Sequence, residues 1–340
     1  MRRLVIVFLM VSVTGMAFPA WAREQIRIVG SGTLYPFVTI AAEQFGQGGK
    51  YLAPIVESTG TGGGFKLFCQ GAGSDTPDIT NASRKITASE YQKCAASGVM
   101  NPVEIQLGYD GIVLANKKGG ASLNLTKKQI FMALARVLPD SSGKLVPNPY
   151  QNWHEIDASL PDQPIKVYGP GTVSGTRDAF AELVMEKGCE PFEAFAHAYS
   201  DAGVRKKICQ AIREDGKYVE SGEDYNVMVQ KLVSNEQALG IFGYGFYSQN
   251  RSQIQASLID GIAPGNDTIT SGKYGISRGL YVYVKRQHLG KIPGIEEFIE
   301  ELGSEDAIGS EGYLTSKGLI PLNAEDRKTV ATKILTLSTK

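Results

Sequence analysis

Short apolar runs and helical patterns alternate along the chain, and loops rich in glycine and hydroxyl residues separate them. Residues Gln25–Val29 alternate between polar and apolar side chains as a β-strand does, and Leu34–Phe45 has the apolar spacing of a helix. The order of strand, glycine or hydroxyl loop and helix then recurs. This rhythm predicts an α/β fold with mainly parallel strands.

The same criteria assign much of the remaining chain. Further predicted strands span Tyr51–Glu57, Asp78–Ala82, Val103–Asn116, Ile165–Tyr168, Ala238–Tyr244 and Gly279–Val284. Predicted helices span Phe65–Cys69, Thr87–Ala96, Thr126–Leu134, Arg177–Lys187, Tyr225–Ser234, Ile295–Leu302 and Arg327–Leu337.

Two of these strands are expected to cross between domains. We predict a break at Gly108–Gly111, where the chain passes into a second domain, and Gly279–Val284 would carry it back. One domain would then comprise residues 23–111 plus 262–340 and the other residues 112–261. The length and the 42% hydrophobic content suit two domains of ordinary size.

The first 22 residues have the three parts of a secretory signal. Arg2 and Arg3 precede an apolar run, Leu4–Val11, and the small residues of Ala20–Ala22 follow. The run is shorter than the roughly 20 residues of a spanning helix. We expect cleavage after Ala22 and a periplasmic protein, with a membrane anchor as the weaker alternative. A lipid anchor is disfavoured because the first cysteine is Cys69.

The charge balance argues against a polyanionic partner. The predicted leader holds two arginines and no acid, so 33 basic and 35 acidic residues remain in the mature chain. Without a basic surplus, we expect no binding to nucleic acid, although one small anion can still be held locally.

Four cysteines remain after the predicted cleavage: Cys69, Cys94, Cys189 and Cys209. An even number in an exported chain favours disulfides. Pairing them in sequence, as Cys69–Cys94 and Cys189–Cys209, closes two short loops, whereas the other pairings tie distant segments together. We predict the sequential pairing. A zinc site is disfavoured because no Cys-x-x-Cys or Cys/His spacing occurs.

Three loops share one design: each follows a strand, is rich in glycine, serine and threonine, and leads into a helix. They are Gly30–Thr33, Ser58–Gly64 and Gly171–Thr176. The N–H groups at a helix start are unpaired and carry partial positive charge, and glycine lets a ligand reach them. Together the loops predict a site for a small tetrahedral oxyanion, although one such loop alone would indicate only an ordinary helix cap.

A bound anion also calls for a cation. Arg84 follows Ser83 at a predicted strand end, and Arg177 follows Thr176 at a helix start. Arginine offers a planar fork that matches two oxygens of phosphate or carboxylate. The alternative for each is a surface salt bridge.

Catalytic patterns are weak. Ser174 lies in Gly-Thr-Val-Ser-Gly, which differs from the Gly-x-Ser-x-Gly of hydrolases, and the three histidines are scattered. We therefore expect a binding protein with no cofactor, no metal ion and no enzymatic activity. A secreted phosphatase or other hydrolase that uses Ser174 is the weaker alternative.

The ordered motifs resemble those of the PstS-type periplasmic phosphate-binding proteins of ABC importers. The segments are GSGTLYPF (30–37), ESTGTGGGF (57–65), DITNASR (78–84), GPGTVSGTRDAF (169–180), ALGIFGY (238–244) and ISRGLYVYV (276–284). The resemblance implies a two-lobe periplasmic binding protein of type II-like architecture, with a mainly parallel sheet flanked by helices in each lobe and two crossing strands. It also implies capture of inorganic phosphate between the lobes, delivery to a membrane permease, and a monomer.

The resemblance also implies the donors of the site. They are the hydroxyl of Thr33 with the N–H of Leu34, the hydroxyl of Thr61, and the groups of Ser174, Gly175 and Thr176. Ser83 and Arg84 occupy the third strand end, where some members have an aspartate after the serine.

Some members carry an arginine before the Ser-Gly-Thr of the later loop, but this chain has none there. The positive charge would then come from Arg84 or Arg177. We expect Asp110, at the first crossing, to accept the proton of phosphate, with a turn aspartate beside Gly111 as the alternative. Sulfate, molybdate or tungstate are the competing ligands on the same fold.

Overall fold

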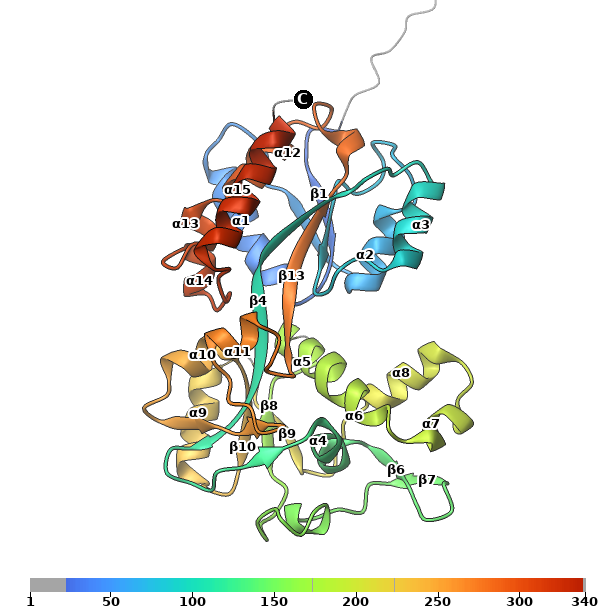
Figure 1. Ribbon diagram of the computed structural model, residues 1–340, viewed down its shortest axis with the longest axis vertical. Coiled ribbons are helices and arrows are strands. Elements are labelled where there is room, and N and C mark those ends of the chain that lie inside the picture. Colours follow the sequence, from blue (N-terminus) through green and yellow to red (C-terminus); the bar gives the residue numbers. More distant parts are fainter. Residues whose placement is uncertain (1–22, 173, 223, 339–340) are drawn as a thin grey trace, which may run out of the picture.

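The computed structural model of the protein describes residues 23–172, 174–222 and 224–338. Figure 1 shows two lobes, one above the other, joined by the strands β4 (Val103–Lys117) and β13 (Ser277–Val284). The predicted secretory signal lies outside the described residues. In the part of the chain that is described, no helix has both the length and the apolar character to cross a membrane.

The first lobe is built on a sheet with the strand order β2-β1-β3-β13-β4. Strands β1 (Arg27–Gly30), β2 (Ile55–Ser58) and β3 (Ile79–Ala82) are parallel, and β13 joins them antiparallel. The flanking helices are α1 (Tyr35–Gln47), α2 (Thr61–Phe68), α3 (Ala88–Ala96), η3 (Arg286–His288), α12 (Ile295–Leu302), α13 (Glu305–Ile308), α14 (Tyr313–Ser316) and α15 (Ala324–Ser338).

The second lobe repeats this plan. Its sheet contains β10 (Leu239–Gly243), β8 (Val167–Gly169) and β9 (Tyr218–Glu220), which are parallel, and β10 and β11 (Ile254–Ala256) pair antiparallel with β4. Small ribbons join β5 (Asn124–Leu125) to β12 (Leu258–Ile259) and β6 (Val137–Pro139) to β7 (Leu145–Pro147). Its helices are α4 (Lys127–Leu134), η1 (Trp153–Glu155), α5 (Gly175–Phe180), the π-helical η2 (Ala181–Glu186), α6 (Lys187–Cys189), α7 (Glu193–Ala198), α8 (Ala202–Gln210), α9 (Tyr225–Ser234), α10 (Tyr244–Gln249) and α11 (Asn266–Thr270). The α/β, two-lobe prediction is confirmed.

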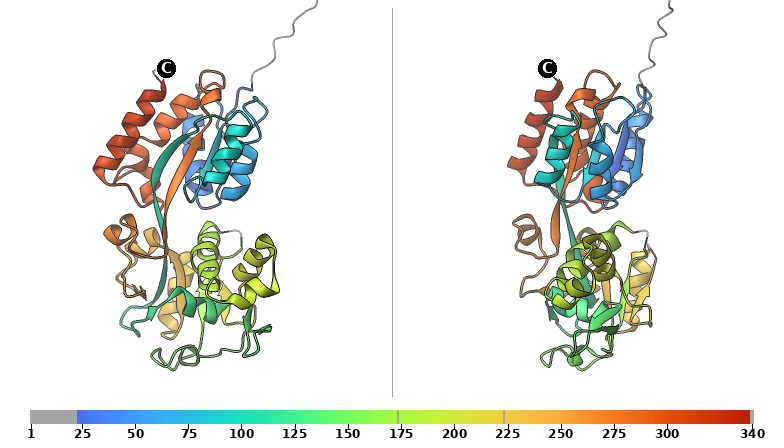
Figure 2. Two further views of the ribbon diagram at one scale, coloured as in Figure 1. Left: turned by 45° about the vertical axis from the view of Figure 1, so that its right-hand side comes forward. Right: turned by 90° about the vertical axis from the view of Figure 1, so that its right-hand side faces the viewer.

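The predicted break at Gly108–Gly111 is wrong, because β4 runs through it as a single strand of 15 residues. Its first part pairs with β13 and its second part with β10 (Figure 2). At Gly108 a side chain would lie 2.5 Å from the carbonyl oxygen of Ile320, whose segment bridges to Tyr109. Glycine at this position therefore permits a close approach of backbones and makes no turn.

Each lobe has its own apolar core. Ile28, Val38 and Phe298 belong to the first core, and Phe131 and Ile241 belong to the second. The second core also includes Ile269, Tyr274 and Ile276, which lie after the predicted lobe boundary at residue 262. We therefore propose that the chain returns to the first lobe along β13, later than the sequence indicated.

Two helices differ from their predictions at the glycine loops. Helix α2 begins at Thr61, four residues before the predicted Phe65, because Gly62–Gly64 are helical. A side chain at Gly64 would lie 2.6 Å from the Cα of Gly30, so this glycine brings α2 close to β1. The predicted helix Arg177–Lys187 contains the π-helical segment η2, and π segments are frequent at functional sites.

Both predicted disulfides are confirmed. Cys69–Cys94 links the end of α2 to α3, and Cys189–Cys209 links α6 to α8. Each disulfide links two helices of the same lobe, so neither restricts the movement of one lobe relative to the other.

Candidate anion-binding site

A cavity of about 160 Å³ lies where the two lobes meet. The first lobe contributes its strand-end loops, the second lobe contributes η2 and α8, and β13 contributes an arginine. The lining residues are Ser31, Gly32, Thr33, Gly60, Thr61, Ser83, Asp178, Ala181, Glu182, Lys206, Gln210 and Arg278. The cavity therefore brings together the first two glycine loops and the third strand end, as the sequence predicted.

The loop between β1 and α1 is held by its own serine. The Thr33 N–H donates to Ser31 Oγ at 3.2 Å, and the Ser31 N–H donates to the Asn81 carbonyl of β3 at 3.0 Å. These bonds fix the Thr33 hydroxyl at the cavity wall. Leu34, at the N-cap of α1, is fully buried, and its side chain packs in the first core away from the cavity lining.

The loop before α2 and the end of β3 meet through two hydroxyl groups. Thr61 Oγ1 lies 3.0 Å from Ser83 Oγ and accepts the Ser83 N–H at 3.1 Å. Both residues are buried, and Thr61 is the first residue of α2, where helix N–H groups carry partial positive charge. The site thus has hydroxyl groups from three separate elements facing one small volume.

The loop before α5 meets the β1–α1 loop across the lobes. The Thr33 hydroxyl donates to the Gly175 carbonyl at 3.4 Å, and a side chain at Gly175 would lie 2.8 Å from the Gly32 carbonyl oxygen. Ser174 caps α5 by accepting the Thr176 N–H, and Thr176 Oγ1 accepts a hydrogen bond from Tyr225. Ser174, Gly175 and Thr176 therefore stand at the lobe contact, but they do not line the cavity.

Arg278 on β13 supplies the guanidinium of the cavity. Its side chain is only 7% exposed, and its Nη1 lies 2.6 Å from Glu182 Oε2 of the opposite lobe. Its Nη2 donates to the Thr33 hydroxyl. The sequence analysis missed this residue, although it lies in the ISRGLYVYV segment. A lone arginine within an otherwise apolar crossing strand was the signal that could have identified it.

Asp110 lies behind Arg278. The two residues are directly opposite each other in the β4–β13 ladder, and Arg278 Nε is 3.8 Å from Asp110 Oδ2. Burial raises the pKa of Asp110 above its ordinary value, and the charge of Arg278 opposes that shift. The turn alternative for Asp110 is wrong, because the residue belongs to a strand. It is absent from the cavity lining, so its direct role is with Arg278.

Two carboxyl groups of the second lobe, also missed by sequence, complete the wall. Asp178 lies close to the first loop, since a side chain at Gly32 would be 2.7 Å from Asp178 Oδ2. Burial raises the pKa of Asp178, and the nearby charge of Glu182 raises it further, against the opposing charges of Arg278 and Arg177. Lys206 Nζ lies 3.8 Å from Glu182 Oε1. The cavity is therefore polar and mixed in charge, with one deeply placed cation.

Comparison with known proteins identifies the family. The model of the PBP superfamily domain matches residues 19–306. Protein SphX of Synechocystis sp. is 30% identical over 313 residues, which cover 90% of this chain and 81% of that protein. The phosphate-binding protein PstS of Staphylococcus saprophyticus is 30% identical over 277 residues, covering 80% and 73%.

The chain belongs to the PstS-type phosphate-binding proteins of the PBP superfamily. A crystal structure of a possible phosphate binding protein from Planctomyces limnophilus agrees with this assignment. It is 28% identical, with a TM-score of 0.71, and the match covers 92% of this chain and 98% of that one. The family resemblance noted in the sequence motifs is thereby confirmed.

In this PstS-type chain neither predicted arginine lines the cavity. Arg84 is half-exposed and forms a two-pronged ion pair with Glu90, at 2.8 Å for both bonds. Arg177 lies over the Tyr218 ring, 4.6 Å from its centroid, and its Nη1 donates to the Pro170 carbonyl. Both arginines thus have partners outside the cavity. The positive charge that lines the cavity comes instead from Arg278 and Lys206.

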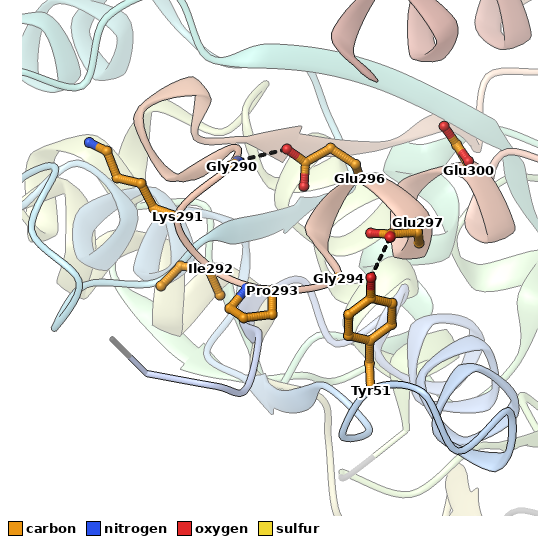
Figure 3. A pocket seen from close by; sticks show the side chains of 9 residues that line it. All are labelled: Tyr51, Gly290, Lys291, Ile292, Pro293, Gly294, Glu296, Glu297 and Glu300. Carbon is orange, nitrogen blue, oxygen red and sulfur yellow. Dashed lines mark hydrogen bonds between the residues drawn. The ribbon is translucent and has the colours of Figure 1, made fainter. Parts of the chain in front are cut away.

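A second pocket, at the start of α12, has a different chemistry (Figure 3). Glu296, Glu297 and Glu300 line it, with Lys291 at the rim. Tyr51 donates a hydrogen bond to Glu297, and Glu296 accepts the Gly290 N–H at 2.7 Å. The lining carries three carboxyl groups and one lysine, and Lys50 pairs with Glu297 from outside it at 3.2 Å, so the net negative charge of this pocket disfavours an anion.

Proposed function

We propose that this PstS-type protein binds one inorganic phosphate ion in the interlobe cavity and delivers it to the permease of an ABC importer. The observation that carries the proposal is the buried guanidinium of Arg278 beside the hydroxyl groups of Thr33, Thr61 and Ser83, in a cavity of about 160 Å³. A guanidinium fork and convergent donors suit a small tetrahedral anion. The SphX and PstS relatives support the assignment.

The two halves of the site lie on different lobes, which suits capture by closure. Thr33, Thr61 and Ser83 line the cavity from the first lobe, whereas Asp178, Lys206 and Gln210 line it from the second. An anion that contacts both sets favours the arrangement in which both are near, because only that arrangement makes all the contacts.

Selection of phosphate over sulfate, molybdate and tungstate would rest on a carboxyl group. Asp178 lines the cavity, and its pKa is raised by burial. At neutral pH phosphate keeps a proton, so its hydroxyl can donate a hydrogen bond to a carboxylate, whereas the same carboxylate repels a fully ionised oxyanion. Because Asp110 lies behind Arg278, we now propose Asp178 as the proton acceptor in place of Asp110.

Export to the periplasm completes the proposal. The predicted leader and the two disulfides both fit an oxidising compartment. A hydrolase role is disfavoured because Ser174 Oγ is engaged in capping α5, while His288 pairs with Asp78 and His154 contacts the Leu160 carbonyl. A serine nucleophile needs an adjacent base.

Calorimetric titration of the ligand-stripped protein tests the function. Phosphate should bind with one ion per chain, and sulfate, molybdate and tungstate should bind far more weakly. Asp178→Asn should weaken phosphate binding and admit sulfate. Asp157→Asn is the control, since Asp157 does not line the cavity and accepts a hydrogen bond from Gln129. Equal affinities of the parent for phosphate and sulfate would contradict the proposal.

A further inference from the structure

The guanidinium that would hold phosphate is already engaged by a carboxyl group of the protein. Glu182 Oε2 lies 2.6 Å from Arg278 Nη1, and the Thr33 hydroxyl accepts a hydrogen bond from Nη2. Behind the guanidinium, Asp110 lies 3.8 Å from Nε. An incoming anion therefore has to compete with Glu182 for the outer face of Arg278.

Glu182 has a second cation within reach. Lys206 Nζ lies 3.8 Å from Glu182 Oε1, whereas Arg278 pairs with the other carboxylate oxygen, Oε2. Lys206 is also 3.1 Å from Glu186 Oε2. Glu182 is thus placed between two cations, one in the crossing strand and one on α8.

The fold fixes the helix that carries Lys206. Helix α8 is tied to α6 by the disulfide Cys189–Cys209, and Gln210 of the same helix donates to Glu186 at 3.1 Å. Glu182 itself has a side chain that is 38% exposed and sits in the π-helical segment η2. The backbone of α8 is thus held in place, while the side chains of Lys206 and Glu182, 46% and 38% exposed, both have room to change rotamer.

The charges around the cavity also require Lys206. Asp110, Asp178 and Glu182 stand against Arg278 and Lys206. A phosphate dianion added beside Arg278 places Glu182 next to a like charge unless the glutamate moves. Lys206 is the cation, among those lining the cavity, that can receive it.

We propose that Glu182 is an exchanging counter-ion that phosphate displaces from Arg278 and that then pairs with Lys206. The proposal rests on the proposed phosphate function and adds a residue that sets its affinity. Glu182 lowers the affinity by competing for Arg278, and Lys206 restores part of it by accepting Glu182. Glu182 and Lys206, which lie outside the glycine loops, would then set the affinity for phosphate.

Phosphate titration of a double-mutant cycle tests this exchange. Glu182→Gln should bind phosphate at least about tenfold more tightly than the parent, because the competitor loses its charge. Lys206→Met should bind about tenfold more weakly. In the Glu182→Gln background the same lysine change should have a clearly smaller effect, because contacting residues that act together are non-additive.

The chain supplies a matched control pair. Lys187 and Glu190 form an exposed ion pair at 2.6 Å one turn further along, outside the cavity. Glu190→Gln and Lys187→Met should leave phosphate affinity unchanged, and all variants should keep the parent's melting temperature within a few degrees.

The outcomes separate the two proposals. If the parent binds phosphate and Glu182→Gln binds it equally or more weakly, the exchange is wrong while the phosphate function stands. Equal effects of Lys206→Met in both backgrounds also overturn the exchange. A parent that does not bind phosphate overturns the function and the exchange together.

Discussion

Replacing Arg278 by glutamine tests the central contact of the site. The side chain is 7% exposed, and it is the arginine among the residues lining the cavity. Truncating one partner of a buried, hydrogen-bonded charge pair costs about 2–5 kcal/mol of binding free energy. At 1.4 kcal/mol per factor of ten, phosphate affinity should fall roughly 30- to 4,000-fold.

The structure indicates that the upper part of this range applies. Arg278→Gln removes the cation that faces the anion and also leaves Asp110 buried beside the site, with its Oδ2 accepting no hydrogen bond from the described part of the chain. Arg278→Lys keeps the charge but loses the planar fork, so its affinity should lie between those of the parent and the glutamine variant.

Isothermal titration calorimetry with phosphate measures the affinity of each variant, and urea unfolding of the same samples measures its stability. The double variant Arg278→Gln/Asp110→Asn should recover stability lost in the single variant, because it removes the uncompensated carboxylate. For the same reason it should recover part of the lost phosphate affinity, but it should stay well below the parent because the cation is still missing. Arg84→Gln is the matched control, since Arg84 pairs with Glu90 outside the cavity. Arg278 is not the central contact if Arg278→Gln binds phosphate within about threefold of the parent, or if Arg84→Gln loses as much affinity.

Three further predictions follow from the fold. Gly175→Ala should weaken phosphate binding and reduce the ligand-induced compaction seen by small-angle scattering, because its Cβ would lie 2.8 Å from the Gly32 carbonyl oxygen across the lobes. Gly171→Ala should behave like the parent, because its Cβ would meet only Glu220 Oε2, at an ordinary contact distance of 3.8 Å. Replacing both Cys189 and Cys209 by serine should reduce the free energy of unfolding by about 3 kcal/mol, since the bridge spans 20 residues, and normal stability would contradict this. Burial lowers the pKa of Lys285 to about 8, below its value in the unfolded chain. Between these two pKa values the unfolded chain binds more protons than the folded one, so the free energy of unfolding should rise by on the order of 1 kcal/mol from about pH 8 to 9.5. Urea unfolding should not show this rise for Lys285→Met.

Local patterns predicted the part of the site that depends on local structure. The loops at Gly30–Thr33 and Ser58–Gly64 follow parallel strands, and the carboxyl ends of such strands meet at one edge, so their hydroxyl groups were bound to come together. Ser174–Thr176 was also found at the lobe contact. Helix caps behaved in the same way, as Thr87 caps α3.

The charged part of the site depends on contacts between distant segments, which no local pattern contains. Arg278 reaches the cavity because β13 pairs with β4 and crosses between the lobes, and Glu182 reaches it from the other lobe. Arg84 was misassigned although its partner was visible in the sequence: Glu90 stands three residues after Thr87 and closes a capping box that also holds the arginine.

Glycine was ambiguous for a physical reason. The same residue serves turns, close backbone contacts and helix packing. At Gly60 the φ angle of 72° requires it, whereas at Gly108 an extended strand uses it to admit the Ile320 carbonyl. Sequence alone gives the residue and leaves its use open.

The pairing of β4 with β13, which one β-bulge between Leu280 and Tyr281 interrupts, has a mechanical consequence. Asp110 and Arg278 face each other within this ladder, on the strands about which any rotation of the lobes must turn. Points on an axis of rotation move least, so Arg278 should shift less than the loops at Thr33 and Gly175, which belong to the two facing lobes. We therefore expect the guanidinium of Arg278 to keep nearly the same position as the lobes open and close. If phosphate binds at Arg278 as proposed, we expect that contact to form before the lobes close, and closure to add the contacts from the second lobe.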